Sequence, residues 1–235
     1  MTANKPLRMV MRDMLFITWA VEPEVARKLV DARFELDTIT DSTGRAVAFV
    51  SAVCFHVAEV RTSIVPLPNL SFQQINYRTY VRAGDVPAVC FLEMKVNSRM
   101  VTAMTGFLNI PVYYEEIEIT TATAGSGPLG YRLRSPGLQV EAMISESHSE
   151  TPSDDKVPPE FITHRLVGYA AAGNGMYRID VEQPGLDSIS ALTQNVKAPG
   201  LEQIGLLTAD QSAQPYSVLY VREGLFGTDA PTREW

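Results

Sequence analysis

The most informative segment of the chain is AVAFVSAVCFHVA, which covers residues 46–58. It alternates two sets of side chains that are both largely apolar, as in a central β-strand covered on each side. One set holds valines, phenylalanines and Ser51, and the other holds mainly alanines with Val50 and Cys54. Valine and phenylalanine favour a strand over the helix that the alanines would allow, so we predict a strand over Arg45–Arg61. Its small-residue face lets another backbone approach closely or leaves room for a cavity.

Similar patterns predict further strands on both sides of this segment. We expect them near residues 9–19, 34–39, 74–82, 88–96, 112–123, 130–135, 138–147, 166–171, 176–182, 188–196 and 216–223. Short helices are expected at residues 23–30 and 98–108, and a helical turn near residues 159–166. Because strands are many and helices few, with no regular strand–helix alternation, we predict a mainly β (α+β) fold with a closed or sandwiched antiparallel sheet.

Composition indicates a globular cytoplasmic protein. Hydrophobic residues make up 46% of the 235 residues, which is enough to bury a core. The 20 basic and 27 acidic side chains give a net charge of −7, which argues against nucleic acid as the main partner. We expect neither a membrane-spanning segment nor a secretion signal. The chain is expected to form one domain over residues 1–235, with a mobile acidic loop at about 145–159 and a loose tail at about 224–235, as a monomer or homodimer.

Familiar catalytic motifs are missing from the sequence. It holds no nucleophile elbow, no dinucleotide-binding fingerprint and no P-loop. His148 falls in the acidic loop, and we interpret His56, on the central strand, as a hydrogen-bonded structural residue. Cys54 and Cys90 fall on apolar strand faces and are expected to be core thiols. We therefore expect no metal site and no cofactor.

The two strands predicted at residues 74–82 and 88–96 form a hairpin with the most promising polar residues. If the apolar faces of both strands enter the same core, a short turn places Val81 opposite Cys90. On the other face this register pairs three further sets of residues: Asn76 with Lys95, Arg78 with Glu93, and Tyr80 with Phe91.

Two interpretations of this polar face remain open. If the face is enclosed, Arg78 can bind a carboxylate in fork geometry, and a desolvated Lys95 can form a Schiff base. If the face meets water, the same residues form an ordinary ladder of cross-strand salt bridges. Tyr113 and Tyr114 lie beside two glutamates and could line the mouth of a pocket.

Several segments occur together in a recognisable order. They are MRDMLF at 11–16 with Trp19, FELD at 34–37, INYRTYV at 75–81, NSR at 97–99, IPVYY at 110–114 and FITHR at 161–165. Together they resemble the YqjF-like family of uncharacterised bacterial proteins, which belongs to the acetoacetate decarboxylase-like superfamily. The similarity runs from about residue 10 to about residue 185, and the INYRTYV segment is its most specific part.

This resemblance implies an acetoacetate decarboxylase-like, β-rich fold around a cone-shaped barrel with an internal cavity. In the decarboxylases, two lysines follow a Gly-x-Pro motif, and one of them forms a Schiff base with a β-keto acid. The equivalent segment here has Val112 and Tyr113 at the lysine positions, so the decarboxylase reaction lacks its amine. Lys95 could substitute only if its side chain faces the cavity.

Three functional hypotheses follow. The first is a cytoplasmic β-barrel that binds a small anionic molecule, such as a carboxylate, in its cavity. The residues assigned to this binding are Asn76, Arg78, Tyr80, Arg99, Tyr113 and Arg165. The second is a decarboxylase or lyase that acts on a keto acid through Lys95, with Glu93 beside it as a catalytic group. The third is a non-catalytic structural or partner-binding module, whose barrel would be filled.

Overall fold

The computed structural model describes residues 5–63, 70–106, 110–123, 127–145, 157–173 and 175–234. The longer strands in these residues are β1 (Leu7–Val21), β4 (Ala46–Thr62), β5 (Phe72–Ala83), β6 (Val86–Val96), β11 (Val167–Ala172), β12 (Gly175–Glu182), β13 (Ile189–Lys197) and β14 (Ser217–Thr228). The shorter strands are β2 (Glu35–Leu36), β3 (Ile39–Thr40), β7 (Val112–Tyr114), β8 (Glu118–Thr123), β9 (Leu129–Arg134), β10 (Gln139–Ile144) and β15 (Thr232–Arg233). The helices are α1 (Pro23–Arg27), α2 (Arg99–Gly106), α3 (Pro159–Thr163), α4 (Pro199–Gln203) and α5 (Ala209–Ser212).

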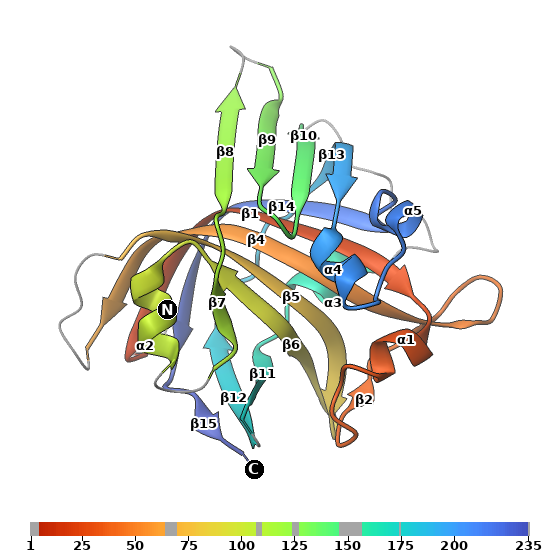
Figure 1. Cartoon of the computed structure of the whole chain (residues 1–235), viewed down its shortest axis with the longest axis horizontal. Coiled ribbons are helices and arrows are strands. Elements are labelled where there is room, and N and C mark those ends of the chain that lie inside the picture. The colour runs from red at the N-terminus through yellow and green to blue at the C-terminus, as the bar shows by residue number, and fades with distance from the viewer. Residues whose placement is uncertain are drawn as a thin grey trace.

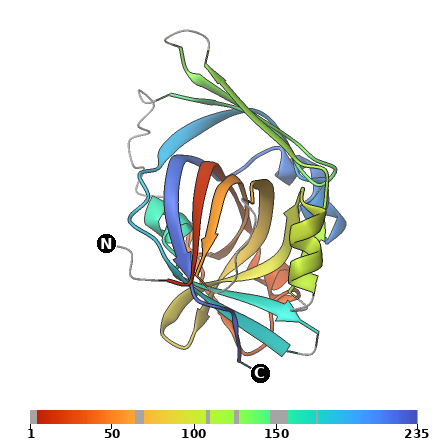
Figure 2. The same ribbon diagram turned by 90° about the vertical axis from the view of Figure 1, so that its left-hand side faces the viewer.

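Seven strands form a closed ring. Their order is β12-β11-β6-β5-β4-β1-β14, and β14 pairs again with β12. The closing pairs are Val181 with Thr228 and Glu182 with Gly227. Figure 2 shows β14, β1, β4 and β5 side by side as a curved part of the wall of this ring. Closure satisfies the backbone groups that an open sheet would expose at its edges.

A second layer of strands covers part of the outer face of the ring. Strand β13 pairs with β14 of the ring, and the layer continues through β10 and β9 to β8. Figure 1 shows β8, β9, β10 and β13 standing together above the curved strands β1, β4 and β5. The ring and this layer together enclose one of the hydrophobic clusters of the protein.

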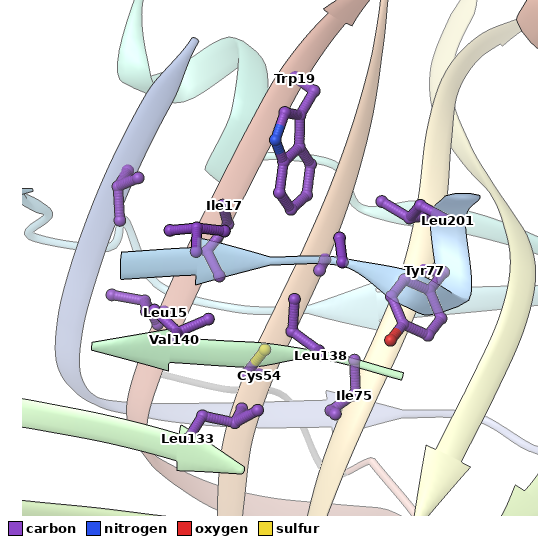
Figure 3. Close-up of a cluster of buried hydrophobic side chains, with 14 of the residues drawn as sticks. Leu15, Ile17, Trp19, Cys54, Ile75, Tyr77, Leu133, Leu138, Val140 and Leu201 are labelled. Atoms are coloured by element: carbon purple, nitrogen blue, oxygen red, sulfur yellow. The ribbon is translucent and has the colours of Figure 1, made fainter. Parts of the chain in front are cut away.

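The cluster between the two layers depends on the small residues of β4. Ala48, Val50, Ala52 and Cys54 are at most 2% exposed, and their small side chains let the second layer approach closely. Figure 3 shows side chains of β1, β4 and β5 meeting Leu133, Leu138 and Val140 across this interface. The small residues of β4 therefore allow close packing of the two layers and do not line a cavity.

The opposite face of β4 lines the inside of the ring. Phe49, Val53 and Phe55 belong to a second buried cluster, the inner cluster, together with Phe16 of β1 and Ile162 of α3. Both faces of β4 are therefore buried, as predicted for a central strand. The mainly β fold is confirmed, and seven of its strands close into a ring.

Several sequence predictions need correction. The sheet is not entirely antiparallel, because β6 pairs in parallel with both β7 and β11. The strand predicted at residues 112–123 is divided into β7 and β8, and α4 and α5 were not predicted. The tail expected to be loose begins inside β14 and also contains β15. Most of the predicted acidic loop, residues 146–156, lies outside the described residues.

No helix in the described ranges is long and apolar enough to cross a membrane.

Candidate functional site

The hairpin of β5 and β6 has a different register from the predicted one. Arg78 pairs with Phe91 instead of Glu93, because the turn consists of Gly84 and Asp85 alone. Gly84 has a φ of +61°, the left-handed conformation that two-residue hairpin turns require. The other predicted pairs are also wrong: Val81 pairs with Ala88, Tyr80 with Val89 and Asn76 with Met94.

A β-bulge then separates Arg78 from Lys95. The register shifts between Tyr77 and Arg78, so that Tyr77 pairs with Glu93. Lys95 pairs with Ile75 in the same way. Directly paired residues share one face of a sheet, so Glu93 and Lys95 lie on the face of Tyr77 and Ile75. Tyr77 and Ile75 belong to the hydrophobic cluster between the ring and the second layer, so this is the outer face of the ring. Arg78 lies on the inner face instead. The expectation that Arg78 and Lys95 share an enclosed side is therefore wrong.

Arg78 lines a cavity inside the ring. The cavity has a volume of about 120 Å³, and its walls are mainly methionine, phenylalanine and valine side chains. The polar residues that line it are Asn76, Arg78, Thr163, Arg165, Gln183 and Thr228. A pocket with apolar walls and a few placed polar groups is typical of a small-molecule site.

The guanidinium of Arg78 is buried, and none of the described carboxylates pairs with it. Arg78 is 9% exposed, and its Nη2 donates a hydrogen bond to the carbonyl oxygen of Ile162 at 2.6 Å. Its carbon Cζ lies 5.5 Å from the ring centroids of both Phe16 and Tyr80. Its Nε is buried and has no hydrogen-bond partner among the described residues. A buried cation with an unused donor is unusual, because burying an unpaired charge is costly.

Arg165 also lines the cavity, but its charge is paired. Its Nη1 donates a hydrogen bond to Oδ2 of Asp37 at 2.6 Å, and its Nε donates to the carbonyl oxygen of Phe161 at 2.8 Å. The guanidinium carbon lies 4.2 Å from the ring centroid of Phe161 and 5.4 Å from that of Tyr80. Arg165 therefore adds hydrogen-bonding groups to the wall with little uncompensated charge.

Tyr80 is held in place by a buried chain of hydroxyl groups. Its oxygen lies 2.7 Å from Oγ of Ser51, which lies 2.8 Å from Oγ1 of Thr18. The hydroxyl is thus engaged away from the cavity, and the ring supports both guanidinium groups. Tyr80 therefore lies beside both arginines without lining the cavity itself.

The remaining predicted site residues lie elsewhere. Nζ of Lys95 donates a hydrogen bond to Oε1 of Glu93 at 2.6 Å and lies 5.1 Å from the ring centroid of Tyr113. The Arg99 guanidinium is exposed and lies 4.4 Å from the ring centroid of Tyr114. These residues are on the outside of the ring.

The positions at which the resemblance implies lysines carry no amine. Val112 packs against the inner cluster, and Tyr113 is 50% exposed beneath Lys95. The structure therefore brings Asn76, Arg78, Tyr80 and Arg165 together and separates them from Lys95.

Three cavity-lining polar residues were missed by the sequence analysis. Nε2 of Gln183 donates to the carbonyl oxygen of Thr163 at 2.9 Å, which ties the end of β12 to α3. Thr228 follows Phe226 on the same face of β14. Had the segment from residue 224 been interpreted as strand, the alternation of Phe226 and Thr228 would have predicted their common orientation.

Other potential reactive groups are buried or hydrogen-bonded. Burial raises the pKa of the Cys90 thiol to about 11 and raises the pKa of the Cys54 thiol further, so neither is an activated nucleophile. Nε2 of His56 lies 2.7 Å from Oγ of Ser71, in agreement with a structural role. The described part of the chain contains no group of three or more histidine, cysteine or acidic residues placed to hold a metal ion.

Solved structures show where else this fold occurs. An acetoacetate decarboxylase-like enzyme from Sphingomonas wittichii RW1 has a TM-score of 0.60 and 11% identity, covering 98% of this chain and 94% of that one. The enduracididine biosynthesis enzyme MppR, complexed with pyruvate, has a TM-score of 0.58 and 12% identity, covering 99% and 91%. Acetoacetate decarboxylase from Legionella pneumophila has a TM-score of 0.62 and 11% identity, covering 98% and 87%. These similarities show an acetoacetate decarboxylase-like fold.

Comparison of sequences identifies the family. The uncharacterized protein YqjF of Bacillus subtilis (strain 168) is 28% identical over 115 residues, which are 48% of this chain and 46% of that protein. The aligned part thus spans about half of each chain. The model of DUF2071, a family of uncharacterized conserved proteins, matches residues 8–223, and this chain belongs to that family.

Proposed function

We propose that this protein is a cytoplasmic protein that binds a small organic carboxylate inside the ring of strands, with Arg78 as its anion contact. The proposal rests on the buried guanidinium of Arg78, which lines a cavity and has a donor nitrogen with no partner in the described part of the chain. Arginine presents its donors in a planar fork that matches the two oxygens of a carboxylate.

The energetics of the buried charge support this proposal. Removing a cation from water without a counter-charge costs several kcal/mol, and only part of that cost is offset by the carbonyl of Ile162 and the two aromatic rings. A bound carboxylate would supply the missing negative charge and an acceptor for Nε. Binding is therefore expected to stabilise the folded protein.

The size and lining of the cavity limit the ligand to a few carbons. Its volume of about 120 Å³ is well above the ~10–15 Å³ that a cavity needs to hold one water molecule, so it has room for a small ligand. The apolar walls suit a short hydrocarbon portion, and Asn76 and Gln183 can hydrogen-bond to a carbonyl or hydroxyl group. A filled ring, as expected of a purely structural module, would leave no such space.

The contacts of the described residues do not favour the lysine-based lyase as a second function. That hypothesis needed Lys95 in the same pocket as Arg78, and the bulge places the two on opposite faces of the sheet. At the family's lysine positions, Val112 and Tyr113 cannot form an iminium. Ligand binding without Schiff-base chemistry is therefore the function that the geometry supports best.

Thermal unfolding tests the proposal with the wild type and Arg78→Met. Pyruvate at about 100 times its Kd should stabilise the wild type by roughly 2.7 kcal/mol, which corresponds to a Tm rise of about 5–10 °C for a chain of this size. Arg78→Met keeps an apolar, similarly long side chain and should lose this rise, because a buried charge is often replaceable by methionine without unfolding.

Arg99→Met is the matched control, because Arg99 is exposed and lies outside the cavity. It should keep the full Tm rise, and sodium chloride at equal ionic strength should produce none. If pyruvate raises the Tm of the wild type and of Arg78→Met equally, Arg78 is not the anion contact. The absence of any rise with pyruvate, acetate, propanoate or 2-oxobutanoate would reject carboxylate binding.

A further inference from the structure

We propose that Asp37 is a specificity-determining residue, which makes the cavity select monocarboxylates over dicarboxylates by neutralising one of its two arginines. This inference rests on the proposed function and defines its ligand class more closely. It concerns a residue that does not line the cavity and acts on it through Arg165.

Two guanidinium groups line the cavity, that of Arg78 from β5 and that of Arg165 from the segment after α3. Their carbons lie 5.5 Å (Arg78) and 5.4 Å (Arg165) from the ring centroid of Tyr80, so both belong to one small region. They are the charged members of the described cavity lining. Without a counter-ion, this lining would carry two positive charges and would suit a dianion.

Asp37 removes one of these charges. Its Oδ2 accepts a hydrogen bond from Nη1 of Arg165 at 2.6 Å, and the two side chains are only 14% and 4% exposed. Little water reaches such a pair, so the opposite charges compensate each other strongly. The backbone N–H of Asp37 donates to the carbonyl oxygen of Tyr80 at 3.0 Å, which fixes Asp37 beside β5.

Arg82 does not alter this charge balance inside the cavity. Its Nη1 lies 4.0 Å from Oδ1 of Asp37, but its side chain is 37% exposed and its Nη2 donates to the carbonyl oxygen of Asp85. A solvated guanidinium at that distance is screened by water. The cavity therefore presents one uncompensated positive charge, at Arg78.

A monocarboxylate matches that charge, whereas a dicarboxylate brings one negative charge too many. The second carboxylate would be buried near Asp37 with no free cation, and burying an unpaired charge is strongly unfavourable. Replacing Asp37 by asparagine keeps the shape of the side chain but releases the charge of Arg165. The variant should then accept a dicarboxylate.

The experiment measures the affinities of pyruvate and malonate by calorimetry at about pH 8, where both carboxylates of malonate are ionised. The wild type should bind pyruvate at least about tenfold more tightly than malonate. In Asp37→Asn the ratio of the two affinities should shift toward malonate by at least about tenfold. The double variant Asp37→Asn/Arg165→Gln, which has neither charge, should return to the preference of the wild type.

Asp31→Asn is the matched control. It removes an aspartate that pairs with an arginine at the same 2.6 Å distance, but Asp31 pairs with Arg33 away from the cavity. Its two affinities should equal those of the wild type.

If Asp37→Asn does not fold, Arg165→Gln and the double variant decide the question. Arg165→Gln leaves Asp37 unpaired near the ligand and should weaken pyruvate binding at least about tenfold, and the double variant should recover it. If pyruvate binding is weakened in both Arg165→Gln and the double variant, Arg165 contacts the ligand directly, and the role of Asp37 is overturned. An unchanged ratio in folded Asp37→Asn would overturn it as well. Failure of the wild type to bind either acid would instead reject the proposed function.

Discussion

Phe91 illustrates how single residues shape the cavity. It pairs with Arg78 across β5 and β6, and its ring lines the same space as the guanidinium. Gly168 of β11 lies directly against that ring, and a Cβ at this position would be 2.5 Å from Cε2 of Phe91. Because glycine has no side chain, residue 168 leaves room for the ring of Phe91.

We expect Gly168→Ala to destabilise the protein by about 1–3 kcal/mol, because the added methyl group forces the Phe91 ring or the backbone of β11 to move. Movement of the ring toward the cavity should also weaken carboxylate binding. Urea denaturation measures the first effect and calorimetry the second. Gly106→Ala is the control: Gly106 lies in α2, and apart from its own helix and chain neighbours no atom of the described residues is within 4 Å of its Cβ position, so this change should not lower stability. Equal stability of Gly168→Ala and the wild type would contradict the packing described.

Six residues were assigned to one binding site from residue type and resemblance. The structure brings four of them together, namely Asn76, Arg78, Tyr80 and Arg165, and it places Arg99 and Tyr113 outside the ring. The counter-ion Asp37 could not be predicted, because it is 128 residues from Arg165 in the chain and only the fold joins them.

At the scale of the elements, one inserted residue in β6 divides the polar face of the hairpin. Tyr77 pairs with Glu93 and Arg78 with Phe91, so Leu92 is the extra residue between them. On either side of the bulge the alternation of side chains is regular, as the sequence predicts. The bulge reverses this alternation, and Lys95 consequently faces outward.

This placement predicts the result of a borohydride experiment. After incubation with pyruvate and sodium borohydride, mass spectrometry should find no adduct on Lys95 above the level of other surface lysines. The reason is that Nζ of Lys95 is hydrogen-bonded to Glu93 and lies across the sheet from Arg78. A stoichiometric adduct on Lys95 that disappears in Arg78→Met would contradict this separation and restore the lyase hypothesis. Lys28→Arg serves as the control for unspecific labelling, since Lys28 lies next to α1.

For the molecule as a whole, closure of the ring depends on the last part of β14. Residues 224–228 pair with the beginning of β1, and the final two of them also pair with β12. Phe226 is 7% exposed in the inner cluster, and Thr228 lines the cavity. The last residues of β14 therefore both close the ring and line the cavity.

A chain that ends after Glu223 should consequently unfold at a much lower temperature. Loss of Phe226 alone removes packing worth about 3–5 kcal/mol, and each kcal/mol corresponds to roughly 2–4 °C for a chain of this size. We expect Tm to fall by at least about 10 °C, or the protein not to fold. A chain that ends after Ala230 keeps β14 and loses only β15, so its Tm should change by a few degrees at most. Equal melting of both truncated chains would show that the closing strand is dispensable.

The sequence alone determined the strand-rich character of this protein, the burial of both faces of residues 46–58, and the resemblance to the family to which it belongs. These properties are local or cumulative: side chains alternate with a period of two along any strand, and apolar content reports burial. Only the tertiary structure decided that Arg78 is enclosed, that Lys95 is outside, and that Asp37 neutralises Arg165. These outcomes depend on a two-residue turn, a bulge and the closing contact of β14 with β12. Each of these features depends on hydrogen bonds between strands, and the alternation of side chains within one segment does not show which strand it pairs with.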